Sequence, residues 1–179
     1  MTPLTPALST DVRNDALRLL SNGLYILTAC AGDTIHAATV SWVTQASFEP
    51  PLVLLALKRN SHLALAVRKA HRFAVNIVSA EQMTLAEKFF AHQTAAADAK
   101  DLGCFPLRVG ATLCPLLTDA LGWLECRLAA EPPTPGDHAL LLGEVTAAGV
   151  RRQATPLVLW GTPWAYGGLR EPYPNEEPR

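Results

Sequence analysis

Residues 38–53 read ATVSWVTQASFEPPLV, and this is the most informative stretch of the chain. Its first part belongs to a longer run, residues 36–48, which is rich in β-branched residues and therefore predicts one long strand. Pro50 and Pro51 end that strand, because proline has no backbone N–H to give to a sheet. Every residue from Leu52 to Leu57 is apolar, so this next run predicts a strand buried on both faces.

The sequence before this stretch predicts a helix followed by a hairpin. Apolar residues at helical spacing predict a helix over residues 11–20, with Ser9 or Thr10 as its N-cap and Asn22-Gly23 at its end. Residues 24–30 are β-prone, and the turn Gly32-Asp33 separates them from the long strand. The chain is therefore expected to enter a barrel through a hairpin.

The sequence after the stretch first mixes helices with a strand and then becomes mainly β. Residues 62–70 and 83–91 have helical periodicity, and Phe73 to Val78 between them predicts a strand. Residues 92–103, rich in Ala, Asp and Lys, predict a mobile surface loop, which is either a lid over a site or a segment without a functional role. Three more strands are expected at residues 121–130, 138–150 and 156–160, with a turn at residues 132–137 joining the first two.

The length of this chain is typical of a single domain. Many strands, few helices and no internal repeat predict a mainly β fold, a barrel decorated with helices. The 179 residues are 49% hydrophobic and 17% charged. We expect one domain over residues 1–170 and a disordered tail over residues 171–179.

Several classes of protein are not expected. No apolar run approaches the roughly 18–20 residues of a membrane helix, and the first ten residues contain no basic side chain of a secretory signal. A net charge of −1 gives no bulk attraction to nucleic acid or to anionic lipid. The four cysteines are widely spaced, which predicts free thiols without a disulfide or a metal site. We therefore expect a cytoplasmic protein that binds neither nucleic acid nor membranes.

The segment Lys58-Arg59-Asn60-Ser61 lies where the apolar strand gives way to a helix. Ser61 or Asn60 can cap that helix, whose first N–H groups carry the positive end of the helix dipole. Lys58 and Arg59 add two cations, so the segment predicts a phosphate site. The alternative is a basic surface turn with an ordinary cap.

Two other features are candidate parts of a site. Thr39 and Ser41 share one face of the long strand, where hydroxyls two residues apart can hydrogen-bond the polar edge of a flat heterocycle such as a flavin. The alternative is a half-exposed strand whose hydroxyls face water. His138 follows the turn Gly136-Asp137 and can face a cofactor or a hydride donor, although a turn histidine is usually exposed to solvent. Motifs of hydrolases and kinases do not occur.

Residues 38–53 resemble the signature Thr-x-Ser-Ser-Phe-x-Ser-Val-Ser-x-x-Pro-Pro-Leu-Val of the flavin reductase-like family. This family includes the reductase components of two-component monooxygenases, flavoredoxin-like electron carriers and the reductase domains of some flavodiiron proteins. The signature is matched by Thr39, Ser41, Ser47, Pro50 and Pro51. The likeness covers residues 14–166 and continues, in the family's order, through residues 73–78, 124–126, 136–138 and 143–145.

The chain also departs from the family's signature. Lys58 and Ser61 match the family's Lys-x-x-Ser segment near the flavin phosphate. Trp42 and Gln45, however, replace two of its serines and Val43 replaces its phenylalanine, so the contacts to the flavin are expected to differ. Trp42 either stacks on the flavin ring or belongs to the core. Cys114 stands near the position where many members have glycine before Pro115, and we assign it no role in the mechanism.

The resemblance implies a split β-barrel that binds FMN, or alternatively FAD, as a homodimer. It implies a flavin reductase that uses NADH or NADPH and supplies reduced flavin or electrons to an acceptor such as a monooxygenase. The alternatives are an FMN electron carrier reduced by a partner protein, a split-barrel enzyme with another small substrate, and a binding module that has lost its cofactor. No metal is expected.

The site residues that the resemblance implies fall into three groups. The residues expected to hold the phosphate are Lys58, Arg59, Asn60 and Ser61. The residues expected along the flavin ring are Thr39, Val40, Ser41, Trp42 and Ser47. The catalytic residue, on the nicotinamide side, is expected to be His138.

Overall fold

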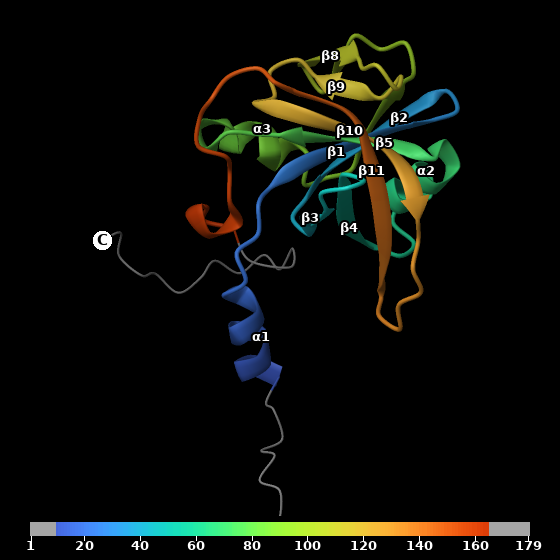
Figure 1. The fold of residues 1–179 in the computed structure, drawn as a ribbon. Helices are drawn as coiled ribbons and strands as arrows, with labels where there is room; N and C mark the ends of the chain where they lie inside the picture. The colour runs from blue at the N-terminus through green and yellow to red at the C-terminus, as the bar shows by residue number, and fades with distance from the viewer. Residues whose placement is uncertain (1–9, 165–179) are drawn as a thin grey trace, which may run out of the picture.

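The computed structural model describes residues 10–164, which form a curled eight-stranded sheet, a small three-stranded sheet and short helices (Figure 1). Both sheets are antiparallel. The order of strands in the large sheet is β3-β4-β11-β10-β5-β1-β2-β6. These strands are β1 (Tyr25–Ala31), β2 (Thr34–Val40), β3 (Val43–Ser47), β4 (Leu52–Lys58), β5 (Arg72–Ile77), β6 (Gln93–Ala96), β10 (Gly122–Ala130) and β11 (His138–Val150). The small sheet contains β7 (Asp101–Leu102), β8 (Phe105–Val109) and β9 (Pro115–Leu117).

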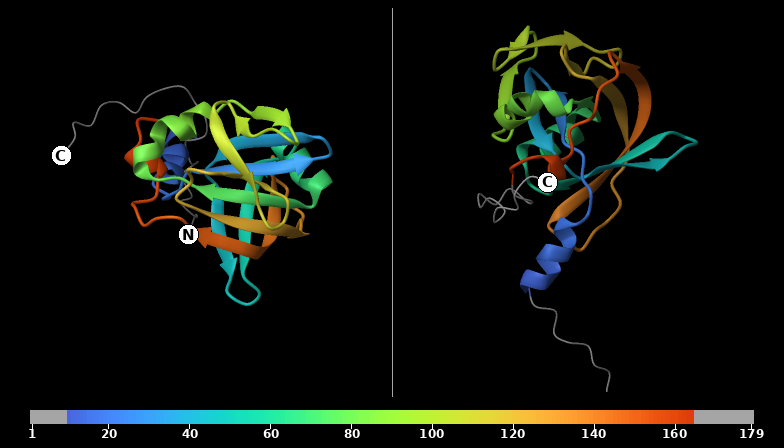
Figure 2. Two further views of the ribbon diagram at one scale, coloured as in Figure 1. Left: turned by 90° about the horizontal axis from the view of Figure 1, so that it is seen from above. Right: turned by 90° about the vertical axis from the view of Figure 1, so that its left-hand side faces the viewer.

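The helices lie at the ends and on the outside of the large sheet. Helix α1 (Thr10–Arg18) projects away from the barrel, whereas α2 (His62–Ala70) packs against β1, β2 and β5 (Figures 1 and 2). Helix α3 (Met83–Lys88) follows the 3₁₀ turn η1 (Ala80–Gln82), and a second 3₁₀ turn, η2, spans Leu159–Gly161. The prediction of a mainly β barrel with helices is confirmed.

The core has two main parts, one on each side of β1. The barrel interior holds the buried residues of β4, β5 and the inner face of α2, centred on Phe73, which is fully buried. The second part lies beneath α3 and the small sheet, where Ile26, Leu85 and Phe89 meet. Because strand residues alternate between two faces, β1 can contribute Leu27 to the first part and Ile26 to the second. Strand β1 is therefore buried on both sides.

Most predicted elements are present, and one predicted strand is divided. The helix at residues 62–70 and the strands at residues 121–130 and 138–150 are confirmed within one residue. The single strand expected over residues 36–48 is wrong: β2 ends at Val40, and β3 begins at Val43. The chain leaves β2 at Ser41 and joins the opposite edge of the sheet beside β4, so a bend at residues 41–42 is required.

Three other expectations differ from the structure. Residues 52–57 lie in β4, but burial alternates along this strand, because the outer face of the barrel is only partly covered. The expected surface loop at residues 92–103 contains β6, which pairs with β2 and completes the edge of the sheet. Residues 156–160 make two isolated bridges, Ser79 with Pro156 and Gly23 with Val158, and then turn into η2. The tail expected after residue 170 lies outside the described residues.

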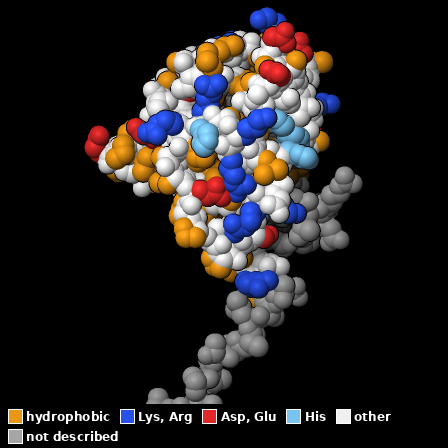
Figure 3. Space-filling view, turned by 90° about the vertical axis from the view of Figure 1, so that its right-hand side faces the viewer, with side chains coloured by type: hydrophobic (Ala, Val, Ile, Leu, Met, Phe, Trp, Pro, Cys, Tyr) orange, Lys and Arg blue, Asp and Glu red, His pale blue; other side chains and the backbone are white. Residues whose placement is uncertain are grey.

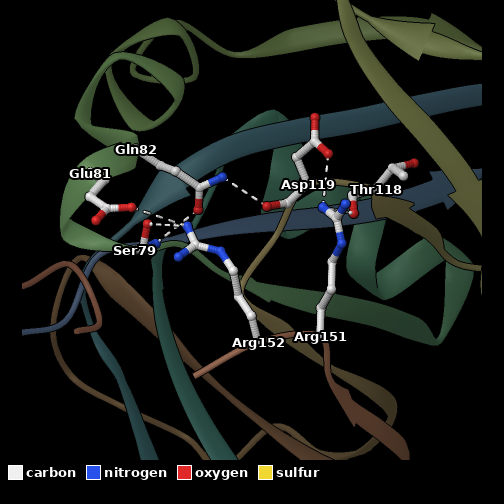
Figure 4. Close-up of polar contacts among 7 residues, drawn as sticks. All are labelled: Ser79, Glu81, Gln82, Thr118, Asp119, Arg151 and Arg152. Atoms are coloured by element: carbon white, nitrogen blue, oxygen red, sulfur yellow. Dashed lines mark hydrogen bonds and ion pairs between the residues drawn. The ribbon is translucent and has the colours of Figure 1, made fainter. Parts of the chain in front are cut away.

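Two arginines fasten the end of β11 to the neighbouring loops (Figure 4). Arg151 donates to Asp119 Oδ1 at 2.8 Å, and Arg152 donates to Ser79 Oγ at 3.0 Å and to Glu81 Oε2 at 3.5 Å. Gln82 Nε2 donates to the Asp119 carbonyl at 2.7 Å. These bonds connect β11 to η1 and so support the start of α3.

Candidate active site

The segment between β4 and α2 brings a capped helix N-terminus and a lysine together. Ser61 has an extended backbone, and its Oγ accepts from the Ala64 N–H at 3.2 Å, which makes it the N-cap of α2. The first turn of α2 contains no acidic residue, and the exposed Lys58 precedes it. The N–H groups of this turn carry partial positive charge. The cap and the cation predicted from the sequence therefore lie together, with the exposed Asn60 between them.

Arg59 lies beside Lys58, but its side chain contacts the turn between β10 and β11. Its Nη2 donates to the carbonyl oxygens of Thr134 at 2.9 Å and Gly136 at 2.7 Å. Its backbone N–H donates to the Asp137 carbonyl at 2.9 Å. The sequence placed Arg59 among the phosphate ligands, whereas the structure shows this nitrogen engaged with the turn that leads into β11.

His138 begins β11 directly opposite Lys58 of β4. Its Nδ1 lies 2.7 Å from Asp137 Oδ1, and this contact lowers the pKa of the Asp137 carboxyl. The His138 ring also packs on Trp42, with ring centroids 4.5 Å apart and planes tilted by 47°. Trp42 lies in the bend between β2 and β3, where its carbonyl accepts from Ala56 N–H of β4. The structure thus gives Trp42 an aromatic partner within the chain that the sequence did not indicate.

The remaining candidate residues divide between two places. Thr39 is fixed by α3, because its Oγ1 donates to the Ala86 carbonyl at 2.6 Å and its N–H donates to the Phe89 carbonyl at 2.8 Å. Val40 and Ser41 follow it into the bend that holds Trp42. Ser47 lines a hollow of about 330 Å³ whose lining is mainly apolar and includes neither His138 nor Lys58. The structure therefore places Thr39 beside α3 and Trp42 beside His138, and it leaves Ser47 apart from both.

Three histidines form a stack beside the start of α2. The ring of His92 lies 5.2 Å from that of His36 and 5.1 Å from that of His62. His36 Nδ1 and His92 Nε2 are 3.1 Å apart. Burial, followed by the charges of neighbouring histidines, lowers the pKa of both His36 and His92. Within residues 10–164 no group of histidine, cysteine and acidic side chains has the geometry of a metal site.

The sequence did not indicate this histidine stack, because its members come from β2, α2 and the segment before β6. Figure 3 shows this side of the molecule, where Lys, Arg and His side chains gather. All four cysteines are free, as expected. In the described part of the chain, no helix is long and apolar enough to cross a membrane.

Comparison with known proteins defines the class to which this fold and site belong. Residues 17–165 match the model of the flavin reductase like domain. The chain belongs to this family, so the family indicated by the sequence is confirmed.

Its similarity to individual relatives covers most of the chain. The NADH-dependent FMN reductase AsuE2 of Streptomyces nodosus subsp. asukaensis is 36% identical over 132 residues, which are 73% of this chain and 69% of that protein. The NADPH-flavin oxidoreductase of Streptomyces viridifaciens is 33% identical over 142 residues, covering 79% of this chain and 72% of that protein. Diflavin flavoprotein A 1 of Synechocystis sp. is 31% identical over 140 residues; the match covers 78% of this chain but only 24% of that longer protein.

Solved structures show the same fold. The NADH:FAD oxidoreductase SgcE6 of Streptomyces globisporus C-1027 superimposes with a TM-score of 0.73 at 21% identity, covering 88% of this chain and 92% of that chain. The styrene monooxygenase flavin reductase SMOB of Pseudomonas putida S12 superimposes with a TM-score of 0.69 at 28% identity, covering 85% and 94%.

Proposed function

We propose that this protein is an NAD(P)H-dependent flavin reductase that supplies reduced flavin to an acceptor such as a monooxygenase. The observation that carries the proposal is that Lys58, just before the Ser61-capped start of α2, is the cross-strand partner of His138, whose ring packs on Trp42. Family membership and the names of similar proteins, such as NADH-dependent FMN reductase, support it.

The residues of the site fit a flavin mononucleotide. A dianionic phosphate matches the capped N-terminus of α2 and the exposed Lys58, which are the donors that such a group needs. We assign Lys58, Asn60 and Ser61 to this phosphate, and Val40, Ser41 and Trp42 to the ring. When bound, the flavin supplies the chemistry, because its ring accepts a hydride from the nicotinamide. The chain's own task is to hold the phosphate and to keep His138 at the side where the nicotinamide approaches.

A second function is favoured by one specific similarity. The match to Diflavin flavoprotein A 1, which covers 24% of that protein, shows that this domain also occurs within a longer flavoprotein. An electron carrier that receives its electrons from another protein is therefore the competing proposal. It differs from a reductase in one measurable respect: its bound flavin would not be reduced by NADH or NADPH.

We also propose that the protein works as a homodimer in the cytoplasm. The mainly apolar hollow lined by Tyr25, Val43 and Val145 supports a second copy as its cover. Phe48, which is 87% exposed, lies in the turn between β3 and β4 directly after Ser47, a residue of the lining, and is a second uncovered apolar group. The free thiols are in keeping with a reducing compartment.

The first test is an absorbance spectrum of the purified protein between about 300 and 550 nm, before and after FMN is added, because bound flavin absorbs in this range. NADH or NADPH is then added without oxygen. Bleaching of the flavin band supports a reductase, whereas a flavin that stays oxidised favours the electron carrier. If the protein neither contains nor binds a flavin, both proposals fail.

Replacing Lys58 with alanine tests the phosphate assignment. We expect FMN binding to weaken by about 1–3 kcal/mol, the range for hydrogen bonds to charged groups, while riboflavin, which lacks the phosphate, keeps its affinity. Fluorescence titration of both ligands measures the difference. Lys69→Ala is the matched control, because Lys69 is an exposed lysine in the last turn of α2, at the opposite end from the proposed phosphate site. Equal losses for FMN and riboflavin would contradict the role of Lys58.

Replacing His138 with alanine tests the nicotinamide side. We expect the reduction of bound flavin by NADH to slow by about 10-fold to 100-fold, since a positioned side chain contributes on this scale, with little change in flavin affinity. Stopped-flow absorbance measures the rate. His71→Asn is the control, because His71 is exposed and asparagine tolerates its left-handed backbone with φ of 54°. A large fall in flavin affinity for His138→Ala would place His138 on the flavin instead.

A further inference from the structure

We propose that Arg59 is a positioning residue for His138: its guanidinium holds the turn between β10 and β11, and so fixes His138 relative to the proposed phosphate site. The inference rests on the proposed function, because it assigns a role within the same site. Arg59 was predicted to be a phosphate ligand, but its side chain contacts the turn between β10 and β11.

The turn needs donors from outside. Residues 132–136 read Pro-Pro-Thr-Pro-Gly, so three of these five residues have no backbone N–H. Inside the turn, the Gly136 N–H donates to Thr134 Oγ1 at 3.2 Å. The carbonyls of Thr134 and Gly136 accept instead from Arg59 Nη2, at 2.9 and 2.7 Å. The turn therefore has few hydrogen bonds of its own, and the two bonds from the Arg59 guanidinium connect it to the end of β4.

Arg59 is itself held by α2. Its carbonyl accepts from Arg68 Nη1 at 2.8 Å, and Arg68 also donates to both carboxylate oxygens of Glu131, at 2.9 and 2.7 Å. The hydrogen bonding of Arg68 to the Glu131 carboxylate lowers the pKa of that carboxyl. Glu131 directly follows β10, so Arg59 and Arg68 together attach α2 to the turn at two points. The contact of Arg68 with Glu131 is a fork of two parallel bonds, which fixes direction as well as distance.

The turn that Arg59 holds leads directly into Asp137 and His138, and His138 is the residue that we assign to the nicotinamide side. The Arg59 N–H donates to the Asp137 carbonyl at 2.9 Å, and the Asp137 carboxylate contacts His138 Nδ1 at 2.7 Å. Trp42 packs against the His138 ring from the bend between β2 and β3. The imidazole is therefore bounded by Trp42, by Asp137 and, across the strand pair, by Lys58. If Arg59 releases the turn, the Asp137 side of this arrangement is lost.

The test separates the positioning role of Arg59 from its charge. Arg59→Lys keeps the positive charge but loses the planar guanidinium, and Arg59→Gln loses both. We expect both variants to reduce bound flavin with NADH about 10-fold more slowly, since a displacement of about 1 Å has effects of this size or larger. The ratio of FMN to riboflavin affinity is expected to stay within about two-fold of the unchanged protein, because the phosphate keeps its own ligands.

A second readout does not depend on flavin or on activity. Hydrogen exchange of the amides at residues 136–138 is expected to be faster in flavin-free Arg59→Lys protein, and faster also in Arg68→Gln protein, because the turn opens more often. Arg127→Gln is the matched control: Arg127 is an exposed arginine of β10 that pairs with Glu144. It is expected to leave the exchange at residues 136–138 and the reduction rate unchanged.

The outcomes are distinguishable. If Arg59→Gln weakens FMN binding about 10-fold or more, spares riboflavin and leaves exchange in the turn unchanged, Arg59 is a phosphate ligand and the positioning role is overturned. If the unchanged protein binds no flavin, the proposed function fails, but the exchange measurement still decides whether Arg59 holds the turn. If Arg59→Gln does not fold, Arg68→Gln provides the same comparison.

Discussion

Glu125→Ala is expected to lower the free energy of unfolding by about 3–5 kcal/mol, because it leaves two N–H groups and a hydroxyl without their acceptor, and each such loss costs about 1–3 kcal/mol. Glu125 is only 2% exposed. Its carboxylate accepts from the N–H groups of Ala111 at 3.0 Å and Thr112 at 2.7 Å, and from Thr112 Oγ1 at 2.6 Å. It thereby holds the turn between β8 and β9 against β10. Urea denaturation of the unchanged protein and of Glu125→Ala measures the difference in the free energy of unfolding.

The contribution of Glu125 should also depend on pH. Burial alone would raise the pKa of the Glu125 carboxyl, but hydrogen bonds from Thr112 and Ala111, with the charge of Arg108, outweigh burial and hold its pKa below the ordinary value. A lowered pKa in the folded state stabilises the fold above the unfolded pKa of about 4.3, and this stabilisation is lost as pH falls through the folded pKa. The difference in stability between the unchanged protein and Glu125→Gln should therefore shrink below about pH 4.

Glu87→Gln is the matched control, because Glu87 is an exposed glutamate of α3. It should change stability by less than about 0.5 kcal/mol across the same range. A loss for Glu125→Gln that is the same at pH 7 and at pH 3 would show that shape, and not charge, is what the turn requires.

How far the sequence predicts this protein depends on whether the deciding contacts are local. The cap was predicted to be Ser61 or Asn60, and the structure has Ser61, because a helix N-terminus is determined by three or four neighbouring residues. Strands β8 and β9 were not predicted, since each contains a proline, which weakens any strand pattern. The division of residues 36–48 was also missed, because a bend at Ser41 and Trp42 is imposed by pairing with β4 and not by local propensity.

The same distinction applies to the site. Lys58 and His138 are 80 positions apart in the numbering, yet they are cross-strand partners on β4 and β11, and only the register of the sheet shows this. Arg59 looked like a phosphate ligand because it follows Lys58 and lies two residues before the helix cap Ser61. The carbonyls that it contacts belong to a turn 75 and 77 residues further along the chain. A sequence pattern can therefore identify the charge but not its partner.

Gly143→Ala is expected to lower the free energy of unfolding by about 3 kcal/mol, at the upper end of the usual cost of overpacking a core. A Cβ at Gly143 would overlap Phe73 Cζ, and would lie 2.8 Å from Phe73 Cε1 and 3.0 Å from Cys126 Cβ. Phe73 is fully buried in the barrel interior, so its ring has little room to move. Gly161→Ala is the control, since its Cβ would meet only Val158 Cγ2, at an ordinary 3.7 Å.

This substitution also links the core to the site. Gly143 lies on β11 opposite Val53 of β4, in the same pairing that places His138 opposite Lys58. If β11 shifts outward to accommodate the methyl group, its distance from β4 changes along the whole ladder. We therefore expect Gly143→Ala protein that is still folded to reduce bound flavin more slowly, as measured by stopped-flow absorbance. Thermal denaturation that is unchanged by Gly143→Ala would show that Phe73 can rotate away, and the close packing of β11 would then not be what keeps His138 opposite Lys58.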